Sequence, residues 1–244
     1  QDYNQLQQIR ESLIHFASIP QTSSTDPLWK WTPGRLPCPD LNHDGISDTI
    51  NGSCSAASSS AVPGMGWLPY KTLKLPELRD SSNEHFWYQV TLAYANSSNV
   101  INHIPPELSF SPTTPYKKEI IAVVIAPGKA LDHQTYRYPL THICTSNCVS
   151  PYKYLEGRNK DTIIETVEKR AETDDEFNDL IVAIQPRDLW LRVEHAVLKE
   201  TKNALIQSKS CFGNAFPKPA PESAMILSAL QVDATARFGK LPIG

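Results

Sequence analysis

The chain has 244 residues, of which 40% are hydrophobic and 20% are charged, and its formal net charge is −3. These values are typical of a globular protein with a sizeable core. The lack of a basic excess argues against nucleic acid as a partner. No run of about 18 apolar residues and no signal peptide is recognisable. With 20 prolines and only 10 glycines, we expect long, stiff connections rather than flexible linkers.

The first predicted element is a helix over residues 3–17. Apolar side chains recur there at helical spacing, and Pro20 ends the pattern. Residues 20–66 are rich in Pro, Ser, Thr, Asp and Gly and show no periodicity. We expect a long loop, and a loop of that length in a compact domain is usually functional or held in place. The apolar stripe of the helix consists of Leu6, Ile9, Leu13 and Phe16.

Three strands are predicted after this loop. Residues 85–95 are aromatic and β-branched with partial alternation. Residues 119–127 form a continuous apolar run, which predicts a central strand that is buried on both faces. Residues 176–186 form an apolar run similar to residues 119–127, and this run ends at Pro186. A long polar stretch, residues 128–175, separates the second strand from the third.

Two helices are predicted to follow, over residues 187–209 and 222–238, with a proline-rich break between them. Strands that are grouped together rather than alternating with helices favour an α+β fold with an antiparallel sheet. We therefore expect a globular domain of helix, loop and sheet over residues 1–186, and a C-terminal helical extension over residues 187–244.

The chain contains five cysteines. Cys38 and Cys54 flank a polar loop, and Cys144 and Cys148 lie close together in another. Close pairs in polar loops favour disulfides formed in an oxidising compartment, so we expect the bridges Cys38–Cys54 and Cys144–Cys148. Cys211 is left over, which keeps other pairings open. Reduced thiols in a cytosolic protein are the alternative.

The segment "DLNHDGISDTIN" has the spacing of oxygen ligands in a calcium loop. Side-chain oxygens occupy its first, third, fifth and ninth positions, a glycine at the sixth permits a sharp turn, and the carbonyl of the seventh is a further ligand. The twelfth position holds Asn instead of the bidentate Glu, which predicts weaker binding. The alternative is a turn-rich loop that binds no ion. The candidate ligands are Asp40, Asn42, Asp44, Ile46, Asp48 and Asn51.

Other polar groups favour structural roles. His142, Cys144 and Cys148 resemble part of a zinc site, but their spacing fits no common template and a small disulfide loop is preferred. No G-x-S-x-G, H-E-x-x-H or P-loop motif occurs, and the histidines are scattered, so an enzyme is the minority interpretation. A further acidic cluster has metal ligands or paired catalytic carboxylates as its alternative interpretation, but a solvated entrance to a strand is the commoner meaning of such a charge run and is preferred. The cluster comprises Asp174, Asp175, Glu176 and Asp179.

Several segments resemble bacterial type IV pilin-like proteins that carry a prepilin-type N-terminal helix. They are "RESLIHFA", "GRLPCPDLNHDGISD", "GMGWLPYKTLKLPELRDSSNEHFWYQV", "AVVIAPGKAL", "YLEGRN" and "DDEFNDLIVAI". The resemblance covers most of residues 6–185 in scattered blocks, is most specific at "LPCPD" and "GWLPYKTL", and is weakest after Arg187. Two features depart from the pattern: "DSS" replaces the usual Asp-Gly after "TLKLPELR", and the hydrophobic N-terminal segment with its processing site is missing.

The resemblance implies an N-terminal α-helix packed on an antiparallel sheet, with variable loops held by disulfides. It also implies an inner-membrane anchor, cleavage by a prepilin peptidase, and assembly with other pilin or pseudopilin subunits into a type IV pilus or a type II secretion-like filament. Such a protein lies in the periplasm or on the bacterial surface, and calcium would be structural. We therefore expect a non-enzymatic minor pilin or pseudopilin. The alternative is a secreted or surface calcium-dependent adhesin or binding module outside any filament.

Overall fold

The computed structural model describes residues 1–19, 33–50, 53–54, 64–95, 105–111, 118–134, 137, 149–161, 166–170 and 174–212. The chain separates into two compact units, Gln1–Val193 and Glu194–Gly244. The division falls inside helix α3 (Pro186–Ser208), whereas the sequence predicts a boundary before that helix. The candidate site described below lies wholly in the first unit.

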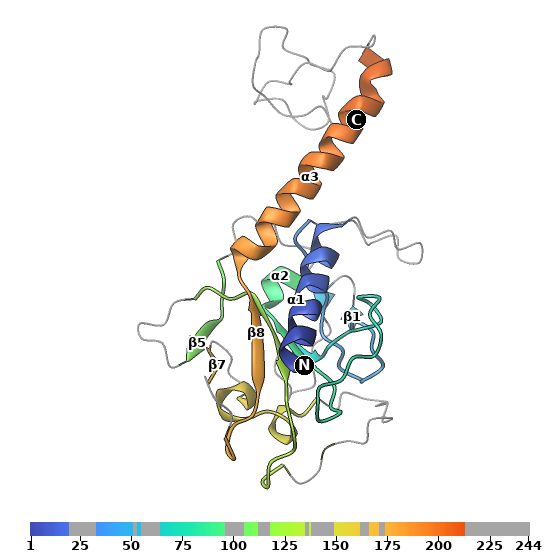
Figure 1. The fold of residues 1–244 in the computed structure, drawn as a ribbon. Coiled ribbons are helices and arrows are strands. Elements are labelled where there is room, and N and C mark those ends of the chain that lie inside the picture. The colour runs from blue at the N-terminus through green and yellow to red at the C-terminus, as the bar shows by residue number, and fades with distance from the viewer. Residues whose placement is uncertain are drawn as a thin grey trace. The chain divides into compact units, whose positions relative to one another are not determined.

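Helix α1 (Asp2–Ser18) forms where the apolar periodicity predicts it. It contacts strands β6 and β8 of the main sheet and lies along one face of that sheet (Figure 1). Arg10, on the flank of the helix, donates from Nε to the carbonyl oxygen of Ala183 in β8 at 3.1 Å and pairs with Asp188 at 2.8 Å. The predicted stripe is confirmed as its buried side, since Leu6, Ile9, Leu13 and Phe16 are all buried.

The main sheet is antiparallel and has the strand order β3-β4-β6-β8. Its strands are β3 (Met65–Trp67), β4 (Trp87–Val90), β6 (Ala122–Ala126) and β8 (Leu180–Ile184). The continuous apolar run was predicted to be a central, buried strand, and this is confirmed: β6 lies between two neighbours and every one of its residues is buried. The mixed helix and sheet composition of the predicted α+β fold is likewise present.

A strand predicted over residues 85–95 is shorter in the structure. Strand β4 ends at Val90, and the short helix α2 (Leu92–Ala95) follows at once. The N–H of Thr91 makes a last sheet-like bond to the Ile121 carbonyl at 2.9 Å, and the N–H of Tyr94 then donates to the Thr91 carbonyl at 2.9 Å. This second bond begins a helical turn, which the alternation of side chains did not reveal.

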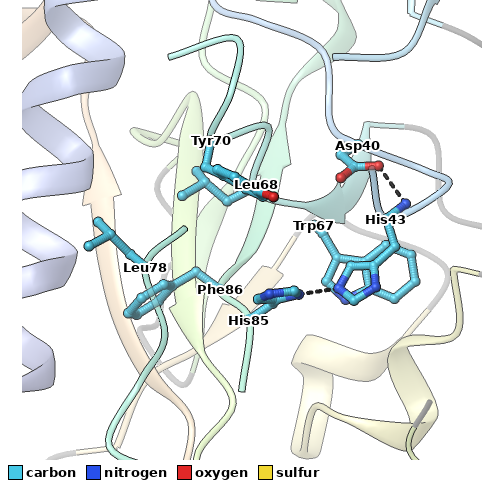
Figure 2. Close-up of a pocket in the computed structure, with 8 residues that line it drawn as sticks. All are labelled: Asp40, His43, Trp67, Leu68, Tyr70, Leu78, His85 and Phe86. Carbon is cyan, nitrogen blue, oxygen red and sulfur yellow. Dashed lines mark hydrogen bonds between the residues drawn. The ribbon is translucent and has the colours of Figure 1, made fainter. Parts of the chain in front are cut away.

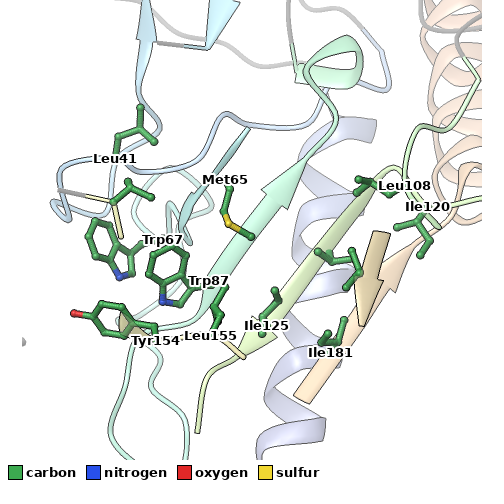
Figure 3. Close-up of a cluster of buried hydrophobic side chains, with 13 residues drawn as sticks. Leu41, Met65, Trp67, Trp87, Leu108, Ile120, Ile125, Tyr154, Leu155 and Ile181 are labelled. Atoms are coloured by element: carbon green, nitrogen blue, oxygen red, sulfur yellow. The ribbon is translucent and has the colours of Figure 1, made fainter. Parts of the chain in front are cut away.

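The second face of the sheet carries a hydrophobic cluster. Side chains alternate along a strand, so Val123 and Ile125 of β6 point away from the face that α1 covers. Figure 3 shows the hydrophobic cluster, with Ile125 labelled, in front of the sheet and α1 behind it. Loop residues close the cluster, among them Tyr154, whose ring centroid lies 5.3 Å from that of Trp87. The sheet is therefore covered on both faces, which explains the uninterrupted apolar run in β6.

The remaining described elements are short, and the sequence did not predict them. Strands β1 (Thr49–Ile50) and β2 (Ser53–Cys54) form an antiparallel hairpin, and β5 (Ser109–Ser111) and β7 (Thr166–Glu168) form a parallel pair. Three 3₁₀ helices cover Pro151–Lys153, Gly157–Lys160 and Lys209–Phe212. Two or three residues are too few to show a strand period.

The C-terminal part of the chain begins with α3, which agrees within one residue at each end with the helix predicted over residues 187–209. The helix predicted over residues 222–238 lies outside the described residues. None of the helices in the described ranges combines the length and the apolar character needed to span a membrane.

Candidate functional site: the loop of residues 40–48

The oxygen-rich loop starts at the edge of the main sheet. Asp40 forms an antiparallel bridge to Trp67, with its N–H donating to the Trp67 carbonyl at 3.0 Å and the Trp67 N–H donating back at 2.9 Å. Two residues earlier, Cys38 forms the predicted disulfide to Cys54, with their Cα atoms 5.3 Å apart. The loop is thus held at its entrance by both the sheet and a covalent bond. The second predicted bridge, Cys144–Cys148, lies outside the described residues.

The carboxylate of Asp40 lies inside the loop and accepts hydrogen bonds from several of its backbone N–H groups. Its Oδ1 accepts the N–H of His43 at 2.6 Å and that of Asn42 at 3.1 Å, and its Oδ2 accepts the N–H of Gly45 at 2.6 Å. Only 1% of the residue is exposed. The chain therefore wraps around one buried carboxylate, a conformation that Asp favours because its short side chain reaches the N–H groups of the next residues.

Burial raises the pKa of Asp40 to about 7. The N–H groups of Gly45 and His43 oppose this shift, and the charges of Asp44 and Asp48 add to it. Burial also raises the pKa of Asp48, while the N–H of Leu41 opposes the change. Burial is thus the main reason that the charged forms of Asp40 and Asp48 are disfavoured, and repulsion between the carboxylates adds to it. A bound cation would offset both effects.

Side chains of other predicted ligands also accept hydrogen bonds from backbone N–H groups of the loop. Asn42 Oδ1 accepts the N–H of Asp44 at 3.0 Å, Asp44 Oδ1 accepts the N–H of Ile46 at 2.7 Å, and Asp48 Oδ2 accepts the N–H of Leu41 at 2.6 Å. The Ile46 side chain is 51% exposed, so the residue would contribute only its carbonyl. Asn51 lies outside the described residues.

The segment "GWLPYKTL" packs against the outer side of the loop and forms hydrogen bonds with it. Gly45 has φ +82°, and a Cβ atom at this position would lie 2.5 Å from Cε1 of Tyr70, so only glycine fits the turn. The Gly45 carbonyl accepts the N–H of Lys71 at 2.9 Å, and the Ser47 N–H donates to Thr72 Oγ1 at 2.9 Å. The Lys71 ammonium donates to the main-chain carbonyl of Asp44. The two most specific sequence blocks therefore form one structural unit.

The donor set suits a hard cation, because Ca²⁺ prefers carboxylate, amide and carbonyl oxygens. Within the described ranges, none of Asp40, Asp44 and Asp48 forms an ion pair. The arrangement itself is that of a hydrogen-bonded turn: among the described residues, no three His, Cys, Asp or Glu side chains are close enough to share one ion. The oxygens would have to turn toward a common point for Ca²⁺ to bind.

A contact between His43 of this loop and His85 was not predicted. His43 has φ +68°, and its Nε2 faces Nδ1 of His85 (Figure 2). The other ring nitrogen of His85, Nε2, lies 2.7 Å from Glu77 Oε1. Burial lowers the pKa of His85 to about 4, so its ring is neutral at pH 7. The two histidines lie 42 positions apart in the sequence, and no spacing signal joins them.

The acidic cluster near residue 174 divides into two environments. Asp174 is solvent-exposed and accepts the N–H groups of Glu176 and Phe177 at 2.8 and 2.7 Å, as expected for a polar entrance to a strand. Asp179 is only 3% exposed and bonds to the N–H of Glu156, so the prediction of a solvated cluster is wrong for Asp179. The candidate ligands His142, Cys144 and Cys148 lie outside the described residues.

No family model, curated protein or solved structure matches the chain. Function is therefore inferred from its residues and its fold.

Proposed function

We propose that this protein is a non-enzymatic structural subunit: the globular part of a minor pilin or pseudopilin, from a type IV pilus or a type II secretion-like filament. The observation that carries the proposal is the placement of α1. This first helix buries its apolar stripe lengthwise on β6 and β8 of an antiparallel sheet. The same arrangement of first helix and sheet is the one that the resemblance to pilin-like proteins implies.

Contacts between the resembling sequence blocks support the proposal. The block "LPCPD" meets "GWLPYKTL" through the bridge between Asp40 and Trp67. The block "YLEGRN" meets "DDEFNDLIVAI" through hydrogen bonds between Glu156 and Asp179. Blocks that are far apart in the sequence thus depend on one another in the folded chain. This dependence gives a physical reason for their occurrence together.

Calcium has a structural role in this proposal. In the loop of residues 40–48, the carboxylates of Asp40 and Asp44 accept N–H groups of the loop's own backbone. Ca²⁺ held by Asp40, Asn42, Asp44, Asp48 and the Ile46 carbonyl would stabilise the loop by neutralising the repulsion between its carboxylates. The ion would contribute its positive charge to the stability of the loop and would take part in no reaction.

The compartment and the partners follow from the same proposal. A disulfide between Cys38 and Cys54 favours an oxidising space such as the periplasm or the cell surface. The partners are other pilin or pseudopilin subunits, together with the inner membrane through a hydrophobic segment that would precede this chain.

The test is expression of the complete gene product in a bacterium that assembles such filaments, with and without its prepilin peptidase. We expect cleavage only in the strain with the peptidase, and recovery of the cleaved protein with sheared filaments. An identical mass in both strains, together with absence from the filament fraction, would overturn the proposal. Release into the medium independently of the peptidase would instead indicate the adhesin or binding module.

A further inference from the structure

We propose that His43 and His85 provide a binding site for one divalent transition-metal ion, held between Nε2 of His43 and Nδ1 of His85. This site uses nitrogen ligands and is distinct from the oxygen ligands of the loop to which His43 belongs. The site is independent of the proposed role in a filament, because it depends only on the local geometry of the two histidines.

The two rings are placed so that one nitrogen of each faces the other. Their centroids are 4.3 Å apart and their planes meet at 65°, and the dashed line in Figure 2 joins His43 Nε2 with His85 Nδ1. In the structure the two nitrogens are in direct contact, which suits a shared proton. A metal ion bound at about 2.0–2.1 Å from each nitrogen needs them farther apart, so the rings must separate when it binds. Imidazole nitrogen is a good ligand for Zn²⁺, Cu²⁺ and Ni²⁺, whereas Ca²⁺ prefers oxygen.

Glu77 sets the tautomer of His85. Its carboxylate Oε1 lies 2.7 Å from His85 Nε2 and also pairs with Arg79, which keeps the carboxylate charged and in place. A carboxylate can only accept at this distance, so the ring proton of His85 is on Nε2 and the lone pair of Nδ1 points toward His43. Metal-binding histidines commonly donate their second ring N–H to a carboxylate in this manner.

His43 is held as firmly as its partner. Its N–H donates to the buried Asp40 carboxylate at 2.6 Å, and its ring lies against Trp67, with a centroid distance of 4.4 Å. Because the loop and the sheet fix the backbone of His43, its ring is directed toward His85 before an ion arrives. Such preorganisation reduces the entropy that is lost on binding.

A small cavity of about 10 Å³ adjoins the histidine pair. This volume corresponds to about one water molecule, so the space suits a single ion or water and excludes an organic ligand. The His85 side chain is 10% exposed, which leaves a path for the ion. No third His, Cys, Asp or Glu joins the pair in the described part of the chain, so water completes the coordination. The cavity is lined by Asp40, His43, Trp67, Leu68, Tyr70, Leu78, His85 and Phe86.

The test is calorimetric titration of the chelator-treated full chain with Zn²⁺, in millimolar Ca²⁺ so that oxygen ligands in the loop are occupied. We expect a binding event that is lost in His43→Ala and in His85→Ala. We expect Glu77→Gln to weaken it about 10- to 100-fold, the usual effect of removing a carboxylate behind a metal-binding histidine. His133→Ala, at an exposed turn, is the matched control and should bind as the wild type does.

A second readout uses Trp67, whose ring touches His43. Cu²⁺ bound by the two histidines should quench the fluorescence of Trp67 in the wild type but not in His85→Gln. Glutamine keeps a hydrogen-bonding side chain at this position, so this variant serves as the test if His85→Ala does not fold. If both histidine variants bind Zn²⁺ as tightly as the wild type, or if the wild type binds none, the pair is only a hydrogen bond and the proposal is overturned.

Discussion

Glu156 and Asp179 each bind the backbone of the other. The N–H of Glu156 donates to Asp179 Oδ2 at 3.0 Å, and the N–H of Asp179 donates to Glu156 Oε2 at 3.1 Å. Both residues are buried, with exposed fractions of 1% and 3%. Burial, followed by the charge of Glu156, raises the pKa of Asp179 well above its ordinary value. Two carboxyl groups therefore join the loop around residue 156 to the start of β8.

This pair predicts a particular dependence of stability on pH. In the unfolded chain the pKa of Asp179 is near its ordinary value of about 4. In the folded protein the Asp179 carboxyl group keeps its proton to a higher pH. The folded state therefore binds more protons between these two pKa values. The stabilisation from this group is complete below about pH 4 and is lost as the pH rises through the raised pKa.

Asp179→Asn should remove this contribution, because the amide is neutral at every pH and can still accept from the Glu156 N–H. Urea unfolding at a series of pH values from about 4 upward would measure it, with Asp132→Asn, an exposed carboxyl in a turn, as the control. We expect the difference in unfolding free energy between wild type and Asp179→Asn to change with pH. A constant difference across the series would contradict the prediction.

The disulfide between Cys38 and Cys54 should stabilise the fold by restricting the unfolded chain. The two residues are 16 positions apart, and for a loop of that length chain entropy gives about 3 kcal/mol. Replacing both cysteines by alanine should lower the free energy of unfolding by about that amount. Mass spectrometry of unreduced peptides checks the link itself, and free thiols at both positions would show that the bridge does not form.

The contact of α1 with the sheet can be measured by a pair of Leu→Ala changes. Leu13 is fully buried on α1, whereas Leu191 in α3 is 72% exposed. Leu13→Ala should destabilise the protein by about 2–5 kcal/mol, because it removes buried methyl groups and leaves a cavity. Leu191→Ala should stay within about 0.5 kcal/mol. Equal effects of the two changes would mean that α1 is not packed on the sheet in solution.

Calcium should raise the thermal stability of the protein. If the loop oxygens bind Ca²⁺, binding stabilises the folded state alone, by about 2.7 kcal/mol at a hundredfold excess over Kd. Because Asn51 replaces the bidentate Glu, we expect a Kd of about 10⁻⁴ to 10⁻³ M. Mg²⁺ should stabilise less, since it needs tight octahedral geometry and keeps its water.

The calcium measurement is thermal melting in Ca²⁺, Mg²⁺ or chelator, for wild type and Asp44→Ala. Asp44 is only half-buried, so its loss should spare the fold while removing a charged ligand. An unchanged melting temperature of the wild type in Ca²⁺ would identify the loop as a turn without an ion. A full response of Asp44→Ala would place the ion elsewhere in the chain.

Elements with a strong local period were predictable from the sequence. Helices α1 and α3 show apolar side chains at helical spacing, and the length and apolar content of the run containing β6 indicated a central strand. The disulfide between Cys38 and Cys54 was also foreseen, because short separations across polar loops favour such bridges. Strand β3 was missed, since three residues carry no period, and β4 ended early where the bond from Tyr94 to Thr91 starts a helix.

By itself, the sequence determined the loop that surrounds Asp40, because this carboxylate bonds to N–H groups within five residues of it. Only the tertiary structure decided that His43 faces His85, 42 positions away, and that Glu156 holds Asp179, 23 positions away. Local spacing determines which side chains share one turn. Contacts between distant segments depend instead on strand register and on how loops pack over the sheet, which no short sequence pattern records.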